Sequence, residues 1–283
     1  MRWLGVLGLV TIVACGGEDH LVSVAEQPGP QQLVIPPMDA GAPMVVEAPV
    51  DAGPVAIEPD PGESTTPPID EVTARDVRAV STSIRSQAVV VTELQGLEQI
   101  LTTIPTTDPK HAVLLHRTAD EYAELAHVTT TPAVVTSSRK KEVAHLTTLI
   151  NNFPSFARLD EARYYRGLAY ERLGDLKNAR SSYYDLIKHH PTSKLIPFAY
   201  FAFGELFFAD ARSDPSKWDL AKQAFMEVLK YPPPANGIFP FALLRVGQVA
   251  DAHGDSAKAQ SNFDRLRRDF PTSAAVKQIP TGR

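Results

Sequence analysis

The 283-residue sequence contains a single cysteine, Cys15. One thiol cannot form a disulfide within the chain, and it cannot build a cysteine-based metal cage. A folded region therefore has to be stabilised by packing, hydrogen bonds and ion pairs. A lone cysteine so close to the amino terminus also needs a separate explanation, such as a covalent modification.

Motifs that indicate catalysis or metal binding are missing from the sequence. The eight histidines are scattered, and none has the spacing H-E-x-x-H or a related spacing of metal ligands. His189 and His190 are adjacent, so on a helix their side chains point about 100° apart and cannot easily share a metal ion. No G-x-S-x-G or comparable nucleophile motif occurs. We therefore expect no enzyme activity, no catalytic residue, no metal site, no cofactor and no small-molecule substrate.

Aromatic residues are missing from a long stretch on the amino-terminal side. After Trp3 the next aromatic residue is Tyr122, and 21 of the 22 aromatic residues lie between Tyr122 and Phe270. Aromatic side chains supply much of the apolar area in protein cores. An aromatic core is therefore expected only in the C-terminal half to two-thirds of the chain.

Basic residues are missing from residues 16–70, which carry ten acidic side chains. Eleven of the 24 prolines also fall between Pro28 and Pro68. Because frequent proline prevents regular structure and like charges repel one another, residues 15–70 are predicted to be a disordered, acidic, Pro/Ala-rich linker. We interpret this linker as a passive spacer, and binding of a cell-wall polymer or a partner by its Pro-rich sequence is the alternative.

Charge in the remainder of the chain is mixed. Residues 71–283 carry 27 basic and 23 acidic side chains, within a total net charge of −5. Lys and Arg alternate with Asp and Glu along the predicted helices, which argues against a nucleic-acid partner.

The amino terminus has the features of a secretory signal. Arg2 precedes an apolar run of twelve residues, 3–14, which is too short for a bilayer span of roughly 20 residues. The sequence Ile-Val-Ala-Cys at residues 12–15 resembles the lipobox of bacterial lipoproteins. The resemblance implies a lipoprotein signal peptide over residues 1–14, cleavage before Cys15, and acyl chains on the sulfur and the new amino group of Cys15. An ordinary signal peptide with an incidental cysteine is the alternative.

The resemblance also bears on location. Several acyl chains anchor a protein stably, whereas one chain is marginal. Gly16 follows the cysteine where an Asp would commonly signal retention in the inner membrane of some bacteria. We therefore expect a lipid anchor in the outer membrane of the cell envelope, with the chain facing the periplasm.

Helical periodicity begins near residue 73. Apolar residues recur at spacings of three, four and seven at Ile84, Val91, Leu94, Leu97, Leu101 and Ile104. This pattern predicts an N-terminal helical segment over residues 71–110. Further helices are predicted over residues 112–128 and before Pro154, where proline cannot continue a helix.

The most informative pattern is a self-match at an offset of 80 residues. The first copy has Gly167, Gly174, Asp175, Ala179 and Pro191, and the second has Gly247, Gly254, Asp255, Ala259 and Pro271. A stretched copy between them has Tyr200, Phe203, Gly204, Phe207, Ala221 and Phe225. Self-similarity at about half this offset indicates stacked helix pairs and not a closed enzyme core.

These copies resemble the tetratricopeptide repeat (TPR) family, whose signature places Gly and an aromatic on one helix and Ala, an aromatic and Pro on the next. The first copy departs from the signature at Arg163 and Arg166, where Trp and Leu are usual, and the last departs at Ala250. The resemblance covers about residues 111–271. It implies an all-α fold, a TPR-type α-solenoid of stacked helical hairpins over residues 111–283. Close helix approach is expected at the glycines and alanines, with the aromatics filling space between hairpins.

The resemblance further implies a concave groove lined by the first helix of each pair. Matched to the motif, the groove residues are Glu161, Tyr164, Leu168, Glu171, Phe198, Phe201, Glu205, Phe208, Phe241, Leu244, Gln248 and Asp251. Aromatic side chains dotted with carboxylates suit an extended peptide or helix with apolar and basic residues. The alternative is that Phe198, Phe201 and Phe241 pack between neighbouring hairpins.

Repeats and lipobox together resemble the TPR lipoproteins of the bacterial cell envelope, such as those of barrel assembly, cell-division coordination and gliding motility. The resemblance implies a non-enzymatic scaffold that binds another envelope protein, with the membrane contacted through the lipid anchor. Two alternatives stay open: a chaperone-like factor for outer-membrane protein assembly, and a regulator or adaptor of cell-wall synthesis enzymes.

Overall fold

The computed structural model describes residues 75–78, 85–233 and 237–280, all of which belong to the second of the two units into which the chain divides, Val55–Arg283. The predicted signal peptide, Cys15 and the predicted linker over residues 15–70 lie outside the described residues. So does Ile84, the first apolar residue of the helical pattern.

The described residues form α-helices and short 3-10 turns, without a strand, so the prediction of an all-α fold is confirmed. The helices are α2 (Gln87–Thr103), α3 (Pro109–Val128), α4 (Pro132–Asn152), α5 (Leu159–Arg172), α6 (Leu176–His189), α7 (Ile196–Asp210), α8 (Trp218–Val228), α9 (Phe239–Ala252) and α10 (Ser256–Asp269). The 3-10 turns are η1 (Pro215–Lys217) and η2 (Ala274–Gln278).

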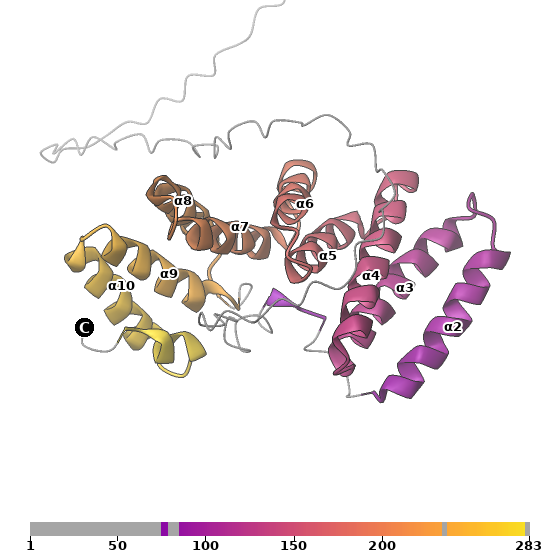
Figure 1. Ribbon diagram of the computed structural model, residues 1–283. Helices are drawn as coiled ribbons and strands as arrows, with labels where there is room; N and C mark the ends of the chain where they lie inside the picture. Colours follow the sequence, from indigo (N-terminus) through magenta and orange to yellow (C-terminus); the bar gives the residue numbers. More distant parts are fainter. Residues whose placement is uncertain (1–74, 79–84, 234–236, 281–283) are drawn as a thin grey trace, which may run out of the picture. The chain divides into compact units, whose positions relative to one another are not determined.

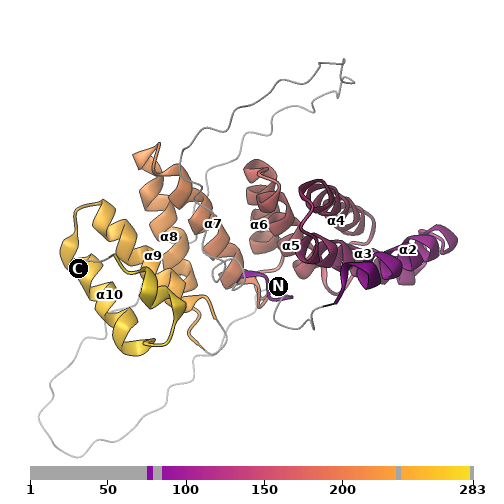
Figure 2. The same cartoon turned by 60° about the horizontal axis from the view of Figure 1, so that its bottom comes forward.

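Each helix packs against the next one along the chain, from α2 to α10, and the two views in Figures 1 and 2 show this succession. The turn η2 then covers α9 and α10. Because contacts are made mainly between sequence neighbours, this is the one-dimensional stacking of a repeat solenoid.

Local sequence signals set the helix boundaries. Asp108, Asp175 and Asp255 are N-caps whose carboxylates accept hydrogen bonds from backbone N–H groups of the first turn. Gly174 and Gly254 adopt φ values of 77° and 74°, which other residues rarely tolerate. Each Gly-Asp pair therefore ends one helix and begins the next within a tight turn, as the self-match predicts.

An aromatic ring of the second helix lies directly against a glycine of the first helix in three successive hairpins. The pairs are Gly167 with Tyr183, Gly204 with Phe225, and Gly247 with Phe263. A Cβ atom at Gly167 would lie 2.6 Å from the Tyr183 ring, well inside van der Waals contact. The three aromatic side chains are 0% exposed. The aromatics thus pack within each hairpin as well as between hairpins, which the sequence pattern did not indicate.

Exchanging Gly247 for alanine tests this packing. We expect Gly247→Ala to lower the free energy of unfolding by about 1–3 kcal/mol, because the new methyl group overlaps the Phe263 ring. Urea unfolding followed by circular dichroism measures the change. Gly96→Ala is the matched control, since Gly96 is exposed inside α2 with nothing within 4 Å of an added Cβ. It should stabilise the chain by about 0.5–1 kcal/mol, and equal effects at both sites would contradict the proposed packing.

Candidate functional site

Four of the predicted groove residues on α7 and α9 are core residues. Their exposed fractions are 0% for Phe201, 1% for Leu244, 7% for Phe241 and 8% for Phe198. The ring of Phe201 packs against that of Phe225 with a centroid distance of 5.4 Å. Because α7 has only two charged residues among fifteen, neighbouring helices have to cover most of its faces. The alternative interpretation, in which Phe198, Phe201 and Phe241 pack between helices, therefore holds, and these side chains do not form an exposed aromatic surface.

Three other predicted groove residues gather around Arg245 of α9. The guanidinium donates to both carboxylate oxygens of Glu205, at 2.6 and 2.8 Å, and to the side-chain oxygen of Gln248 at 2.8 Å. It also lies 5.0 Å from the centre of the Phe208 ring. Asp251 is half-buried one turn further along α9. Arg245 thus ties this part of α7 to α9, a role that the motif did not predict.

The predicted groove residues of α5 divide into two kinds. Tyr164 and Leu168 are 0% and 1% exposed, whereas the side chains of Glu161 and Glu171 are 30% and 17% exposed. The Tyr164 hydroxyl donates a 2.7 Å hydrogen bond to the backbone carbonyl of Arg75. Residues of the predicted groove are therefore contacted by the chain itself, through the segment at residues 75–78. This segment is the short purple piece in the middle of Figure 1.

Arg75 forms a two-point ion pair with Glu171 of α5. Its two terminal nitrogens donate to the two carboxylate oxygens at 3.0 and 2.7 Å. The Arg75 side chain is only 5% exposed. Burial by itself lowers the pKa of Arg75, but the Glu171 carboxylate outweighs burial and raises that pKa above its usual value. The pair is thus a desolvated, charge-assisted contact. Removing either partner would leave the other charge buried without its ion pair.

Arg78 joins the segment to α3 and α4. One of its terminal nitrogens donates to Glu142 at 3.0 Å and to Asp120 at 3.3 Å. Its guanidinium also lies 3.9 Å from the centre of the Tyr165 ring. Glu142 is 0% exposed, so a positive partner has to offset the cost of burying this carboxylate.

Asp76 carries the opposite charge and faces two arginines. It accepts a hydrogen bond from the Arg78 Nε at 3.1 Å and pairs with Arg172 of α5 at 3.0 Å. Burial raises the pKa of Asp76, but the guanidinium groups of Arg78 and Arg172 outweigh it and lower the pKa from 3.8 to about 2. Every charged side chain of the segment therefore has a partner on the helices.

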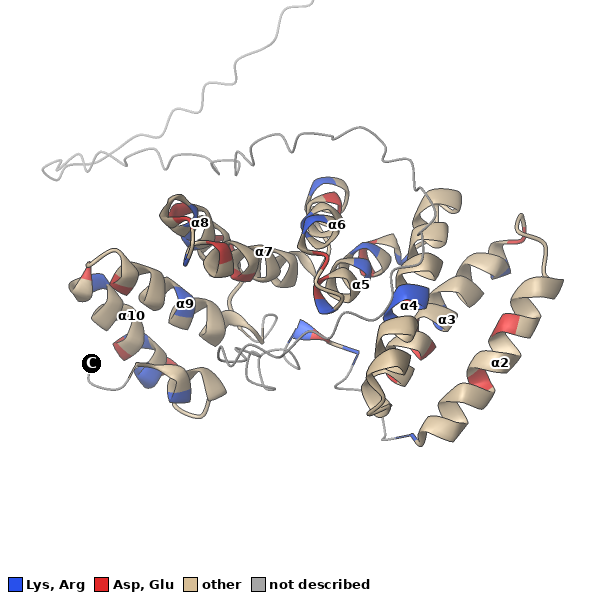
Figure 3. Cartoon of the chain, in the orientation of Figure 1, with Lys and Arg blue, Asp and Glu red and all other residues tan. Residues whose placement is uncertain are grey.

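We call the helix residues that hold this segment the acidic cradle. The acidic cradle consists of Asp120 of α3, Glu142 of α4, and Tyr164, Tyr165, Glu171 and Arg172 of α5. Figure 3 shows the blue and red residues of the segment beside α5. Of these six residues, only Tyr164 and Glu171 were predicted as groove residues.

The sequence contains one signal for the segment. Arg75 is the first Lys or Arg after Arg2, so the acidic stretch of residues 16–70 is soon followed by Arg-Asp-Val-Arg at residues 75–78. The contacts themselves could not be predicted, because Arg75 and Glu171 are 96 residues apart in the sequence.

No group of three or more His, Cys, Asp or Glu side chains in the described part of the chain is arranged to hold a metal ion. No helix among these residues combines the length and apolarity needed to cross a membrane.

Comparison with known proteins identifies the repeats. A sequence model of the tetratricopeptide repeat family matches residues 161–193 and 241–273. The first match covers most of α5 and all of α6, and the second covers most of α9 and all of α10. Two of the three glycine–aromatic hairpins are thus tetratricopeptide repeats, and the fold expected from the self-match is confirmed. Repeats of this class bind protein partners.

Several solved structures are similar to the chain at low sequence identity. Nearly identical TPR-like repeats from Podosopora anserina are 14% identical with a TM-score of 0.45, over 65% of this chain and 89% of that one. PilW, a type IV pilus biogenesis factor, is 12% identical with a TM-score of 0.41, over 68% and 96%. PilF of Pseudomonas aeruginosa is 14% identical with a TM-score of 0.36, over 68% and 95%. None of the curated proteins compared with the sequence matches it.

The pairing of Asp76 with Arg78 and Arg172 predicts that the fold loses stability in acid. Because the pKa of Asp76 is about 2 in the folded chain and 3.8 in the unfolded chain, its ion pairs stabilise the fold fully above pH 4–5. This contribution of about 2 kcal/mol is lost as the pH falls through 2, and about 1 kcal/mol of it is lost between pH 6 and pH 3. Urea unfolding at pH 6 and pH 3 should show that Asp76→Asn loses about 1 kcal/mol less than the wild-type chain.

Asp264→Asn, on the exposed side of α10, is the control for this measurement. It should leave the difference between pH 6 and pH 3 within a few tenths of a kcal/mol of the wild-type value. An Asp76→Asn chain with the same pH difference as the wild type would show that the ion pairs of Asp76 do not contribute.

Proposed function

We propose that the protein is a non-enzymatic scaffold of the bacterial cell envelope. In this proposal it is anchored in the outer membrane through a lipid on Cys15, faces the periplasm, and binds another envelope protein with its helical repeats. The observation that supports the binding role most directly is the acidic cradle. It already holds a short charged segment by side chain and main chain, which is how repeat arrays bind extended peptides.

The anchoring part of the proposal rests on the sequence. The lipobox-like residues 12–15 end an apolar run of signal-peptide length, and residues 16–70 provide a long acidic, Pro-rich connection to the repeats. A lipid at Cys15 would thus leave the repeats free to meet a partner away from the membrane surface.

Specific charge pairing favours a defined partner over a chaperone-like role. A chaperone for unfolded barrel proteins needs an exposed apolar surface, yet Phe198, Phe201 and Phe241 are buried. The partly exposed residues of the predicted groove are mostly polar or charged, such as Glu161 and Gln248. These side chains suit a partner that carries fixed basic groups.

Charge reversal on α5 tests the binding role in cells. We expect Glu161→Lys in the tagged, full-length chain to reduce by about tenfold the amount of each specific envelope protein captured after cross-linking, because it repels a basic partner. Quantitative mass spectrometry measures the captured proteins. Asp264→Lys is the matched control, since Asp264 and Glu161 each pair with an arginine three residues away. An unchanged captured set with Glu161→Lys would place partner binding elsewhere.

Replacing Cys15 tests the anchor. We expect Cys15→Ala to abolish incorporation of labelled palmitate and to move the protein from the outer-membrane fraction to the soluble periplasmic fraction, because the acyl chains have no attachment site. Cell fractionation and immunoblotting measure the distribution, and globomycin should make the wild-type precursor accumulate. A Cys15→Ala protein that still sediments with the membrane would contradict anchoring through this residue.

A further inference from the structure

The acidic cradle holds residues 75–78 with groups from three different helices. α5 supplies the ion pair to Arg75, and α3 and α4 supply the carboxylates that meet Arg78. The segment itself is four residues long, and three of them are charged. Its attachment therefore depends on a few strong polar contacts and not on a broad apolar surface.

The carboxylates of the acidic cradle also have partners on the helices themselves. Each one has a second partner within the array: the Tyr183 hydroxyl donates to Glu171 at 2.9 Å, Arg139 donates to Glu142 at 2.7 Å, and His116 Nδ1 lies 3.0 Å from Asp120. A site whose acceptors are fixed before the ligand arrives is preorganised, which reduces the ordering cost of binding.

The acidic cradle also recognises features that any extended peptide with arginines has. The Tyr164 hydroxyl binds a main-chain carbonyl, and the face of Tyr165 stacks on the guanidinium of Arg78. Glu171 accepts two parallel hydrogen bonds from Arg75, a geometry that a planar guanidinium provides and an ammonium does not. The contacts select arginine at two positions separated by two residues.

An empty cradle is unfavourable for electrostatic reasons. Without Arg78, the fully buried Glu142 would keep one positive partner, Arg139, in place of two. Without Arg75, the side chain of Glu171, which is 17% exposed, would lose its ion pair. Because unpaired carboxylates are costly to bury, the cradle favours occupation by some arginine-bearing segment.

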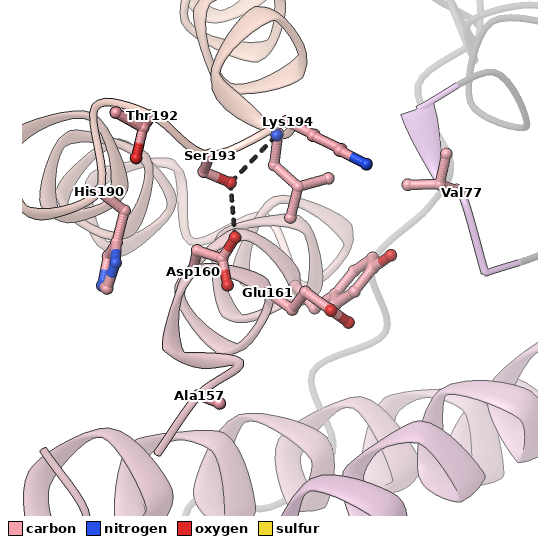
Figure 4. A pocket seen from close by; sticks show the side chains of 10 residues that line it. Val77, Ala157, Asp160, Glu161, His190, Thr192, Ser193 and Lys194 are labelled. Atoms are coloured by element: carbon pink, nitrogen blue, oxygen red, sulfur yellow. Dashed lines mark hydrogen bonds between the residues drawn. The ribbon is translucent and has the colours of Figure 1, made fainter. Parts of the chain in front are cut away.

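The bound segment is exposed at Val77. Val77 is 38% exposed and borders an open pocket of about 580 Å³. Figure 4 shows Val77 on one side of this pocket and Asp160 and Glu161 of α5 across from it. The turn before α7 lines the pocket at Ser193, which donates a 2.6 Å hydrogen bond to Asp160. A second chain can therefore approach the edge of the acidic cradle without unfolding the array.

We propose that the acidic cradle is a binding site for an extended partner segment with the pattern Arg-x-x-Arg, and that residues 75–78 occupy this site in cis until such a partner displaces them. This inference rests on the proposed function, because it names the chemistry of the partner. Only six residues, 79–84, separate the segment from Arg85 at the start of the next described stretch. So short a connection gives the cis segment an effective concentration on the order of millimolar, which weakens binding in trans.

A synthetic peptide tests the proposal. The probe is a fluorescein-labelled peptide with the sequence of residues 72–81, and its binding to the full-length chain in detergent is measured by fluorescence anisotropy. We expect the Arg75→Ala/Arg78→Ala chain to bind this peptide about tenfold or more tightly than the wild-type chain, because the cis competitor is lost. A peptide with both arginines replaced by lysine should bind about tenfold more weakly, because lysine cannot form the two-point contact.

The matched control is Lys258→Ala/Arg268→Ala, which removes the same charge from α10 at side chains that are 71% and 70% exposed. It should bind the peptide as the wild type does. Adding Glu171→Gln to the Arg75→Ala/Arg78→Ala chain should abolish binding. If the double variant loses its helical circular dichroism, Arg75→Lys replaces it, with the same expected direction, because this change keeps the charge and removes only the two-point contact.

Equal peptide affinity in the wild-type and variant chains would overturn the proposal. So would a folded variant that takes up no peptide, since residues 75–78 would then be a permanent part of the fold. The result is separate from the test of the proposed function. If the peptide binds but no envelope protein is captured, the proposed function is contradicted and the binding site is supported. If envelope proteins are captured but the peptide does not bind, only the proposed binding site is contradicted.

Discussion

The contact between a glycine on one helix and an aromatic ring on the next is the constraint on which the repeat array depends. Tyr183, Phe225 and Phe263 each lie where a Cβ atom on the facing helix would overlap the ring. The missing side chain lets two helices approach closely, and the ring fills the space at that position. Because the contact recurs in three successive hairpins, each hairpin presents a similar face to the next, and the array can extend by simple stacking.

Close packing of this kind also decides where a binding site can be. In α7 and α9 most aromatic and aliphatic residues are buried against neighbouring helices, and the polar residues Glu205 and Gln248 bind Arg245. α5 differs because it carries charged residues at several positions around the helix, so carboxylates stay at the edge of the core. Glu171 of α5 and Glu142 of α4 receive positive partners from residues 75–78. The polar site thus lies on α3, α4 and α5, whose carboxylates require positively charged partners.

In the proposal, the location of the segment would let partner binding regulate the scaffold. In the sequence, the acidic stretch of residues 16–70 is followed by the first arginines after Arg2, and these arginines are the ones bound by the acidic cradle. A connection to the membrane and an occupant of the binding site would therefore belong to one continuous piece of chain. Partner binding and release of this piece would be coupled, since both use the same carboxylates.

The sequence alone determined the helical class, the repeat period and the turns, because these follow from local spacing: Gly174-Asp175 and Gly254-Asp255 need only their own neighbours to form a cap. The sequence also carries the resemblance to the repeat family, and that resemblance placed Tyr164 and Glu171 in a groove. Burial of Phe201 and Leu244, and the pairing of Arg75 with Glu171, were decided only by the tertiary structure. Both depend on which faces meet across tens of residues, and a periodic pattern assigns a residue to a face of its helix without stating what covers that face.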